Sequence, residues 1–354
     1  MTRGRAAVLA ALVSTLITSV TACSVGFGGG STALAAAGSD TLRLGYFANL
    51  THATALIGVG GGYFQRALGS TRLATEVFTA GPDEISALLT GAIDAAYVGP
   101  APAVNGYVRS HGQALRIIAG ATTGGAELIV KPSITSVAQL GGKTLATPQL
   151  ANTQDVALRY FLKQNGFRTA VTGGGDVTIE PTANATTLTL FAAGRLDGAW
   201  LPEPFASQMV AEGGHMLIDE RSLWPGGRFT TTDLVVSTTY LDAHPDAVAS
   251  LLRGQIAANA WADANSTVAQ SIVNAALKKL TGKALTPGVM ARAWAELAVT
   301  NDPLAATLQA EEAHAVSVAL VKPADLGGIL DLGPLNAALR TAGQPTVSAA
   351  GLGT

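Results

Sequence analysis

The sequence has 354 residues, which is enough for two domains, and 48% of them are hydrophobic, which is enough for a sizeable core. Charged residues make up 13% of the chain, against about 25% in an average soluble protein. With a net charge of -2 and no basic block, the composition gives no electrostatic footprint for nucleic acid.

The N-terminus has the pattern of an export signal. Arg3 and Arg5 precede an uncharged apolar run over residues 6–20, shorter than the ~20 residues that a membrane span needs. The run ends in Val-Thr-Ala-Cys, and Cys23 is the only cysteine. This ending resembles a bacterial lipobox, which implies cleavage after residue 22 and a lipid on Cys23. The alternative is an ordinary signal peptide with a chance cysteine.

A tether is predicted between this signal and the folded part. Residues 24–39 are rich in Gly, Ala and Ser without periodicity, which is typical of a flexible linker. One cysteine cannot form a disulfide within the chain. No later segment is apolar enough to span a membrane, so we expect an exported, soluble domain after a signal peptide at residues 1–22 and a tether at 23–39.

From residue 41 onward, short apolar runs alternate with helical patterns. Strands are predicted at 41–47, 73–78, 94–99, 115–121 and 126–132, with helices at 52–68, 82–91 and 102–112. A capping box at Ser136 and Gln139 then precedes strands at 143–147, 176–181 and 197–202, with helices at 152–166, 184–194 and 204–214. Residues 257–320 are mostly helical. Strands separated by single helices imply parallel pairing and an α/β layered fold.

Two segments of the chain repeat one pattern. Residues 91–103 read GAIDAAYVGPAPA, and residues 194–206 read GRLDGAWLPEPFA. Each has a helix-ending Gly, an Asp that opens a strand, and a Pro turn before the next helix. Because open α/β sheets bind ligands at the carboxyl ends of strands, the repeat predicts two similar lobes facing one cleft. The alternative is that this pattern is common to the helix ends and strand starts of any α/β protein.

Residues 42–59, 78–102, 134–162 and 194–206 together resemble the solute-binding proteins of ABC importers. The subfamily is the one that includes aliphatic sulfonate, taurine, nitrate and thiamine-pyrimidine binders, and the similarity is greatest to the aliphatic sulfonate type. It covers residues 40 to about 342 in the same order. It implies a two-lobed, type II periplasmic-binding-protein-like fold, with a mixed, mostly parallel sheet flanked by helices in each lobe and a helical C-terminal part.

The resemblance also implies lobe boundaries. Lobe 1 would comprise residues 40–127 and 236–354, and lobe 2 residues 128–235. The crossings would be the extended stretches 128–132 and 233–238, acting as hinge strands that let the lobes close around a solute.

A sulfonate is an anion that only accepts hydrogen bonds, so its pocket needs donors, which helix N-termini supply. Four strand-to-helix junctions fit, and the resemblance places them in the ligand site. The candidate ligand-binding residues are Asn49, Thr51, His52, Gly99, Ala101, Gly124, Gly125, Asn152, Thr153, Gln154, Trp200 and Glu203.

Several of these residues have a second interpretation. His52 would otherwise be a solvated surface histidine, and Asn152 and Thr153 would simply cap a helix. Trp200 is expected to form an apolar wall for an alkyl chain. Glu203 would repel a sulfonate, so it is expected to meet a ligand ammonium, a water or an internal arginine such as Arg228, or only to favour a helix N-terminus.

The sequence favours a binding protein over an enzyme. Residues 141–144, GGKT, are not a P-loop because the required earlier glycine position holds a valine, and the five histidines have no metal-ligand spacing. We therefore expect no cofactor, no metal and no catalytic site. The expected partners of this monomer are a small anion, an ABC permease and ATPase, and the membrane through the lipid anchor, with the domain facing the periplasm or cell exterior. A taurine, nitrate or thiamine-pyrimidine binder, an enzyme on the same fold, and a receptor that feeds a sensor are the alternatives.

Overall fold

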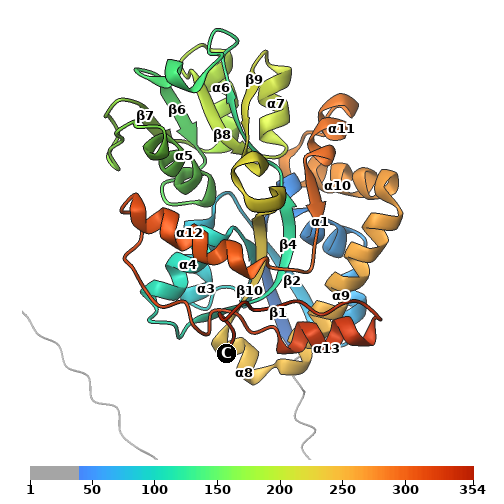
Figure 1. Ribbon diagram of the computed structural model, residues 1–354. Helices are drawn as coiled ribbons and strands as arrows, with labels where there is room; N and C mark the ends of the chain where they lie inside the picture. The colour runs from blue at the N-terminus through green and yellow to red at the C-terminus, as the bar shows by residue number, and fades with distance from the viewer. Residues whose placement is uncertain (1–39) are drawn as a thin grey trace, which may run out of the picture. The chain divides into compact units, whose positions relative to one another are not determined.

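The computed structural model describes residues 40–354, so the predicted signal peptide, Cys23 and tether lie outside the described residues. Within residues 40–354 the strands form one six-stranded and one five-stranded sheet, each flanked by helices (Figure 1). We call the unit around the six-stranded sheet the large lobe and the unit around the five-stranded sheet the small lobe. The mixed α/β, two-lobed fold expected from the resemblance is confirmed.

The large-lobe sheet has the strand order β11-β4-β10-β3-β1-β2. Strand β1 runs parallel to β2 and β3, whereas β10 is antiparallel to β3 and β4. The strands are β1 (Thr41–Phe47), β2 (Arg72–Phe78), β3 (Ala95–Val98), β4 (Leu115–Gly124), β10 (Thr230–Ser237) and β11 (Leu297–Val299).

The small-lobe sheet has the order β7-β6-β8-β5-β9. Strand β6 is parallel to β7 and β8, and β5 is antiparallel to β8 and β9. The strands are β5 (Ala126–Val130), β6 (Thr144–Thr147), β7 (Thr178–Pro181), β8 (Gly198–Pro202) and β9 (His215–Asp219).

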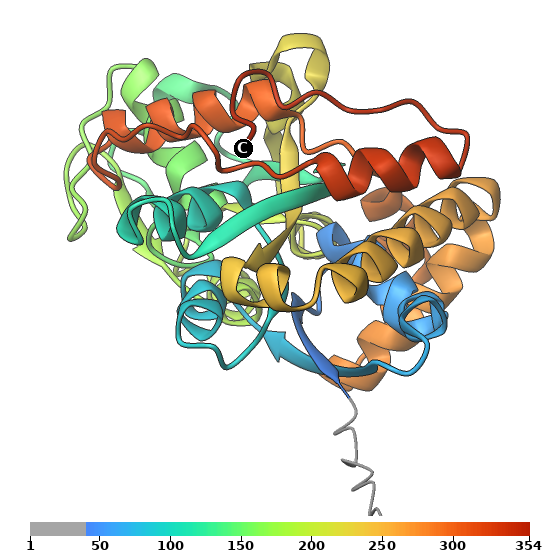
Figure 2. The same cartoon turned by 90° about the horizontal axis from the view of Figure 1, so that it is seen from below.

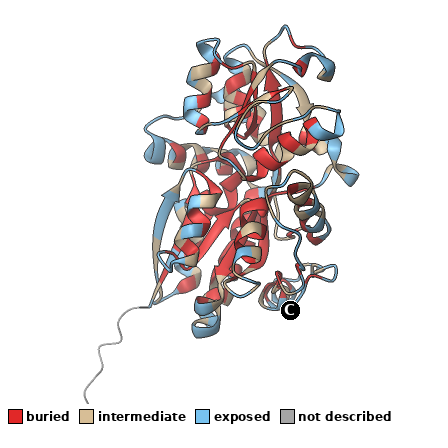
Figure 3. Ribbon diagram, turned by 90° about the vertical axis from the view of Figure 1, so that its left-hand side faces the viewer, coloured by how far each residue is buried: buried red, intermediate tan, exposed pale blue. Residues whose placement is uncertain are grey.

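Helices cover both sheets, and buried residues concentrate on the strands and on the helix faces turned toward them (Figure 3). In the large lobe these are α1 (Ala53–Gly60), α2 (Tyr63–Leu68), α3 (Gly81–Leu89), α4 (Pro100–Arg109), α8 (Thr238–Ala243), α9 (Pro245–Ala264), α10 (Ser266–Thr281) and α13 (Gly333–Thr341). In the small lobe they are α5 (Thr153–Gln164), α6 (Asn184–Ala192) and α7 (Phe205–Ala211). Figure 2 shows the C-terminal α13 lying beside the long α9.

The C-terminal part of the chain contacts both lobes. Helix α11 (Pro287–Ala295) packs against α7 of the small lobe, and α12 (Ala305–Ser317) contacts both α4 and α5. Short 3₁₀ turns complete the fold: η1 (Leu50–His52), η2 (Val137–Leu140), η3 (Glu220–Leu223) and η4 (Pro225–Gly227).

Every strand predicted between residues 41 and 202 is present, whereas β9 and β11 were not predicted. The predicted helix 52–68 is divided into η1, α1 and α2, because Gly62 adopts a φ of 72° between α1 and α2. The boundary expected at residue 235 falls inside β10, which pairs with β3 and β4 from Thr230 to Ser237. The chain therefore returns to the large-lobe sheet before β10 rather than within it.

The repeated segments occupy equivalent places in the two sheets. Strand β3 lies beside the parallel β1, and β8 lies beside the parallel β6. The Asp that opens each strand accepts a hydrogen bond from the main chain of that neighbour: Asp94 Oδ2 from Arg43 N at 2.8 Å, and Asp197 Oδ2 from Thr144 N at 3.0 Å. The repeat is thus a shared way of fixing strand register in each lobe.

Candidate functional site

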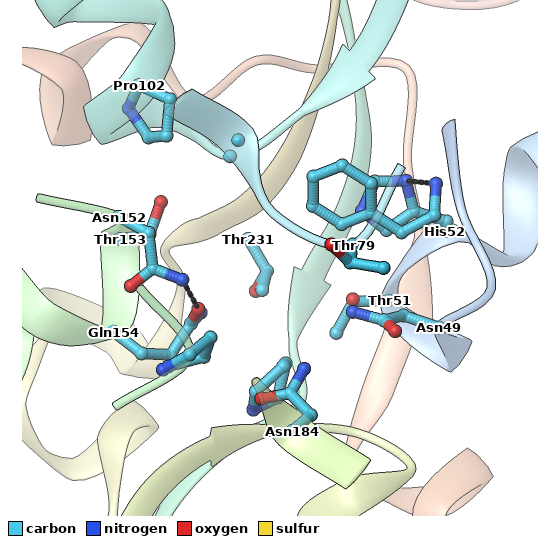
Figure 4. Close-up of a pocket in the computed structure, with 15 residues that line it drawn as sticks. Asn49, Thr51, His52, Thr79, Pro102, Asn152, Thr153, Gln154, Asn184 and Thr231 are labelled. Carbon is cyan, nitrogen blue, oxygen red and sulfur yellow. Dashed lines mark hydrogen bonds between the residues drawn. The ribbon is translucent and has the colours of Figure 1, made fainter. Parts of the chain in front are cut away.

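A cavity lies where the ends of strands from both lobes meet (Figure 4). Its volume is about 30 Å³, room for about two water molecules. We call it the polar pocket. It is lined by Phe47, Asn49, Thr51, His52, Thr79, Gly81, Gly99, Pro102, Pro148, Asn152, Thr153, Gln154, Asn184, Pro202 and Thr231.

The large lobe supplies Asn49, Thr51 and His52 from the turn after β1. His52 is only 2% exposed, and its Nδ1 accepts a hydrogen bond from Phe47 N at 3.2 Å. Burial lowers the pKa of His52 to about 3, so the ring is neutral near pH 7. Because Nδ1 is the acceptor, the proton sits on Nε2, which makes His52 a neutral N–H donor. The interpretation of His52 as a solvated surface histidine is therefore wrong.

The small lobe supplies the N-terminus of α5 opposite these residues (Figure 4). Asn152 is the N-cap: its Oδ1 accepts from Asp155 N at 2.9 Å. Its Nδ2 donates to Gln154 Oε1 at 3.3 Å, which leaves the Gln154 amide NH₂ to donate elsewhere. Thr153 and Gln154 are the first two helical residues, so their main-chain N–H groups have no partner within the helix. Capping and pocket lining therefore coexist at this junction.

Two buried polar atoms of the pocket wall have no hydrogen-bond partner within residues 40–354. Thr153 is 3% exposed and Asn184, the first residue of α6, is 7% exposed, yet Thr153 Oγ1 and Asn184 Oδ1 are unpaired. An unpaired buried polar atom costs roughly 1–3 kcal/mol. A solute that hydrogen-bonds both side chains would remove this cost; the Asn184 amide can turn its NH₂ toward an oxyanion.

Gly99 permits the lobes to approach at the pocket. A Cβ atom at this position would lie 2.3 Å from Thr153 Oγ1 across the interlobe boundary. Its φ of -67° is ordinary, so the requirement for glycine here is space rather than backbone conformation.

The pocket wall is polar but nearly free of charge. It contains no Asp, Glu, Lys or Arg, and His52 is the one ionisable side chain in the lining. The first residues of α5 and α6 contribute positive helix ends instead. Neutral donors and helix ends of this kind suit a small anion and offer no carboxylate to a ligand ammonium.

The other candidate residues do not line the polar pocket. Ala101 packs among Val156 and Ala315, between α4, α5 and α12. Gly124 and Gly125 lie where the chain crosses from β4 to β5 and have φ values of 73° and 74°, which explains why glycine is used there.

Trp200 is fully buried in the small-lobe core and not in the cavity wall. Its Nε1 donates to Glu220 Oε2 at 2.7 Å. The structure therefore does not place an apolar wall for an alkyl chain at Trp200.

The Glu203 side chain is also fully buried and turned away from the pocket. Its partner is an internal arginine, Arg292 of α11, whose Nη1 donates to Glu203 Oε1 at 2.9 Å. Arg228, the arginine suggested from the sequence, instead lies 3.8 Å from Asp302. Burial, followed by the neighbouring Glu127 carboxylate, raises the pKa of Glu203 to about 7.

Sequence reasoning missed several lining residues. Thr79 and Gly81 follow β2, and Asn184 follows β7, so the rule that ligands bind at the carboxyl ends of strands could have found them. Thr231 lies at the amino end of β10. Since β10 is antiparallel to β3, its amino end faces the cleft, and the rule for parallel strands does not identify it.

A second, larger cavity of about 740 Å³ adjoins the polar pocket between α6, α7, the end of α10 and α11. It is lined largely by apolar side chains such as Leu188, Phe205 and Leu285. In the segment after β1, Ala48 lines this second cavity, whereas Phe47 and Asn49 line the polar pocket. In the segment after β8, Pro204 lines the second cavity and Pro202 lines the polar pocket, so Glu203 lies between the two cavities.

Within residues 40–354, no group of three or more His, Cys, Asp or Glu side chains is placed to hold a metal ion. None of the helices in the same range combines the length and apolar character that crossing a membrane requires.

The fold is shared with solved structures of low sequence identity. The alkanesulfonate-binding protein SsuA from Xanthomonas axonopodis pv. citri, bound to MOPS, is 21% identical, with a TM-score of 0.65 over 80% of this chain and 94% of that one. The periplasmic nitrate-binding protein NrtA from Synechocystis PCC 6803 is 15% identical, with a TM-score of 0.69 over 81% and 83%. The desulfurization enzyme DszB also shares the fold, with a TM-score of 0.61, 17% identity and coverage of 86% and 99%.

Sequence comparison identifies more direct relatives. A candidate binding protein of Brucella abortus is 29% identical over 174 residues, which is 48% of this chain, and the chain spans about half the length of the curated relatives it matches. The model of the NMT1-like family matches residues 35–277, more than half of the sequence. The chain therefore belongs to the NMT1-like family.

Proposed function

We propose that this protein is an extracytoplasmic solute-binding protein of an ABC importer that captures a small organic anion between its lobes. One observation carries the proposal: the polar pocket presents neutral donors from both lobes and contains buried polar atoms without a protein partner. A solute is the natural partner for such atoms. The structural neighbours support a binding role, because several proteins of this fold are named for the solutes they bind.

Within this class we propose an aliphatic sulfonate as the solute. The three oxygens of a sulfonate accept hydrogen bonds from several directions, which matches donors at the turn after β1 and at the starts of α5 and α6. The volume of about 30 Å³ holds a head group of this size rather than a whole long-chain solute, so capture requires the lobes to part and close again. Nitrate is the competing candidate because it also fits as a bare anion.

Taurine receives less support from the polar pocket. Its ammonium would need a carboxylate, and Glu203, the residue suggested for this role, is turned away and paired with Arg292. A thiamine-pyrimidine precursor is a flat molecule that is too large for the cavity unless the lobes open. Taurine remains an arm of the binding experiment.

Calorimetry with ethanesulfonate, nitrate, taurine and ethanol tests the proposal. We expect ethanesulfonate to bind, and ethanesulfonate at a hundred times its Kd to raise the unfolding free energy by ~2.7 kcal/mol. Ethanol has the same carbon chain without the anion and is expected to do nothing. If no anion binds and native mass spectrometry of the purified protein shows no bound solute, the proposal is wrong. If nitrate binds more tightly than ethanesulfonate, nitrate replaces the sulfonate as the proposed solute.

An enzyme on the same fold is the second candidate, since DszB is such an enzyme. The polar pocket argues against it: its one ionisable side chain, His52, is buried and has a pKa lowered to about 3. Recovery of intact ethanesulfonate after prolonged incubation would support the binding protein, whereas turnover of it would support the enzyme.

Lipid anchoring at Cys23 and delivery to a permease complete the proposal. They rest on the lipobox pattern and on the fold neighbours, among them a ligand-binding component of an ABC-type import system from Staphylococcus aureus, with 15% identity and a TM-score of 0.69 over 84% of this chain and 99% of that one. Cys23→Ser should move the protein from the membrane fraction to the soluble extracytoplasmic fraction, because the lipid supplies the membrane affinity. Retention in the membrane fraction would contradict the anchor. Neighbouring genes for a sensor kinase would favour signalling over transport.

A further inference from the structure

Glu203 joins four parts of the molecule. Its main-chain oxygen accepts hydrogen bonds from Leu50 N at 2.9 Å and Thr51 N at 3.3 Å, at the start of the turn that carries the solute-facing residues. Its main-chain N donates to Gly125 O at 2.8 Å, at the crossing between the lobes. Its carboxylate accepts from Ser207 N at 3.1 Å and Ser207 Oγ at 2.9 Å, in the first turns of α7. The fourth part is α11, through Arg292.

Arg292 is the cation that holds this junction. Its Nη1 donates to Glu203 Oε1 at 2.9 Å and to Ser207 Oγ at 2.8 Å, and its Nη2 donates to Glu127 Oε2 at 2.6 Å. The side chains of Glu127 and Glu203 are 1% and 0% exposed, and Arg292 is 26% exposed. One guanidinium thus serves two buried carboxylates, Glu127 on β5 and Glu203 directly after the adjacent strand β8.

The hydrogen bonds from Leu50 and Thr51 have a direct consequence for the polar pocket. They occupy the free N–H groups of η1 with a carbonyl of the small lobe, so the donors left to a solute at this turn are side chains: Asn49, Thr51 and His52. The placement of those side chains then depends on where the Glu203 carbonyl lies.

We propose that Arg292 and Glu203 are positioning residues for the solute pocket: Arg292 fixes Glu203, and the Glu203 carbonyl fixes the turn of Asn49, Thr51 and His52. The inference rests on the proposed binding of an anion in this pocket. It makes α11, which has no residue in the polar pocket, part of the machinery that sets affinity.

A matched control exists on the same helix boundary. Arg221 of η3 pairs with Glu296, the residue that follows α11, and with Asp219 at 2.9 Å. This ion pair also links the end of α11 to η3, which follows β9 of the small lobe, but none of its members hydrogen-bonds the turn after β1. Arg221→Met therefore removes a comparable ion pair and leaves every hydrogen bond of Arg292 and Glu203 in place.

The experiment compares Arg292→Met, Arg292→Lys and Arg221→Met by calorimetry with ethanesulfonate and by amide hydrogen exchange. Arg292→Met is expected to weaken ethanesulfonate binding roughly 10-fold or more and to speed exchange of the Leu50 and Thr51 amides. Arg221→Met should change affinity less than about 3-fold and leave those amides protected. Arg292→Lys keeps one ion pair and should fall between them, and it carries the test if Arg292→Met does not fold.

Equal losses in Arg292→Met and Arg221→Met would overturn the inference, because general lobe contact would then explain both. Unchanged exchange of Leu50 and Thr51 in a folded Arg292 variant would also overturn it. If the wild-type protein binds neither ethanesulfonate nor nitrate, the proposed function fails instead, and the exchange experiment alone decides whether Arg292 positions the turn.

Discussion

The two repeated segments, residues 91–103 and 194–206, begin alike and end differently. In each, the Asp that opens the strand receives a main-chain hydrogen bond from the neighbouring parallel strand. Each then places a buried aromatic residue that donates to a buried acceptor: Tyr97 OH to Gln255 Oε1 at 2.7 Å, and Trp200 Nε1 to Glu220 Oε2 at 2.7 Å. The amino-terminal halves of the segments therefore do the same structural work in both lobes.

The carboxyl-terminal halves divide the functional work. Gly99 and Pro202 stand at equivalent places and both line the polar pocket. Beyond them, Pro102 remains in the pocket wall, whereas Glu203 turns back to hold the turn after β1. A repeat can therefore keep the way in which a strand is held while its far end changes from contacting the solute to positioning other residues.

The largest expected effect comes from filling the space at Gly99. Gly99→Val would place a Cβ 2.3 Å from Thr153 Oγ1, so the lobes could not close to the observed distance. We expect ethanesulfonate affinity to fall by about 100-fold or more in calorimetry. Gly288→Val is the control, because nothing lies within 4 Å of a Cβ there. Wild-type affinity in Gly99→Val would show that the lobes need not meet at this point.

Replacing Glu220 with Gln gives Trp200 a buried amide acceptor, like the one that Gln255 provides for Tyr97 in the large lobe. Burial raises the pKa of Glu220 from 4.5 to about 7, so its contribution to stability is fully present below pH 4.5 and is lost as the pH rises through 7. Glu220→Gln keeps an oxygen for Trp200 and has no such loss. Relative to wild type, the variant should gain about 3 kcal/mol between pH 4 and pH 8 in urea unfolding. A pH-independent difference would contradict the buried charge.

The sequence predicted the fold far better than the direction of side chains. Alternation of strands and helices placed β1 through β8, and the turn residues Asn49, Thr51 and His52 and the α5 start at Asn152, Thr153 and Gln154 do line one cavity. Polar residues that directly follow the carboxyl end of a parallel strand lie at the edge of the sheet that faces the cleft, which is why these residues lie together in the lining; their role in binding a solute stays a prediction.

The sequence could not show which way the side chains point near the end of β8 and directly after it. Trp200 and Glu203 also lie near the carboxyl end of a parallel strand, where ligands are expected to bind. Trp200 nevertheless fills the core, and Glu203 pairs with Arg292, which is 89 residues away in the chain. Such a partner is set by how α11 packs on α7 and leaves no local signal. Thr231 was missed for a related reason, since only the antiparallel pairing of β10 brings its amino end to the cleft.

A third prediction tests whether the small-lobe pocket wall contributes a donor. Thr153→Val keeps the shape and removes the unpaired hydroxyl. Losing one hydrogen bond to a charged solute should weaken ethanesulfonate binding by ~1.5–3 kcal/mol, which is about one to two decades in Kd. Thr186→Val, at an exposed position of α6 outside the pocket, is the control. Unchanged affinity in Thr153→Val would show that the Thr153 hydroxyl does not bind the solute.

The smallest expected effects concern the shared halves of the repeat. Asp94 accepts from Arg43 N, Nε and Nη2, and its side chain is 8% exposed, whereas Asp197 accepts from Thr144 N and Lys131 Nζ and is 26% exposed. Asp94→Asn should lower the unfolding free energy by roughly 1–3 kcal/mol and Asp197→Asn by about 1 kcal/mol or less, because exposed ion pairs contribute little. Both Asp residues lie at the amino ends of strands, away from the cleft, so ethanesulfonate affinity should stay unchanged in both variants while urea unfolding shifts. If Asp94→Asn instead weakened binding without lowering stability, the division between a structural first half and a functional second half would not hold.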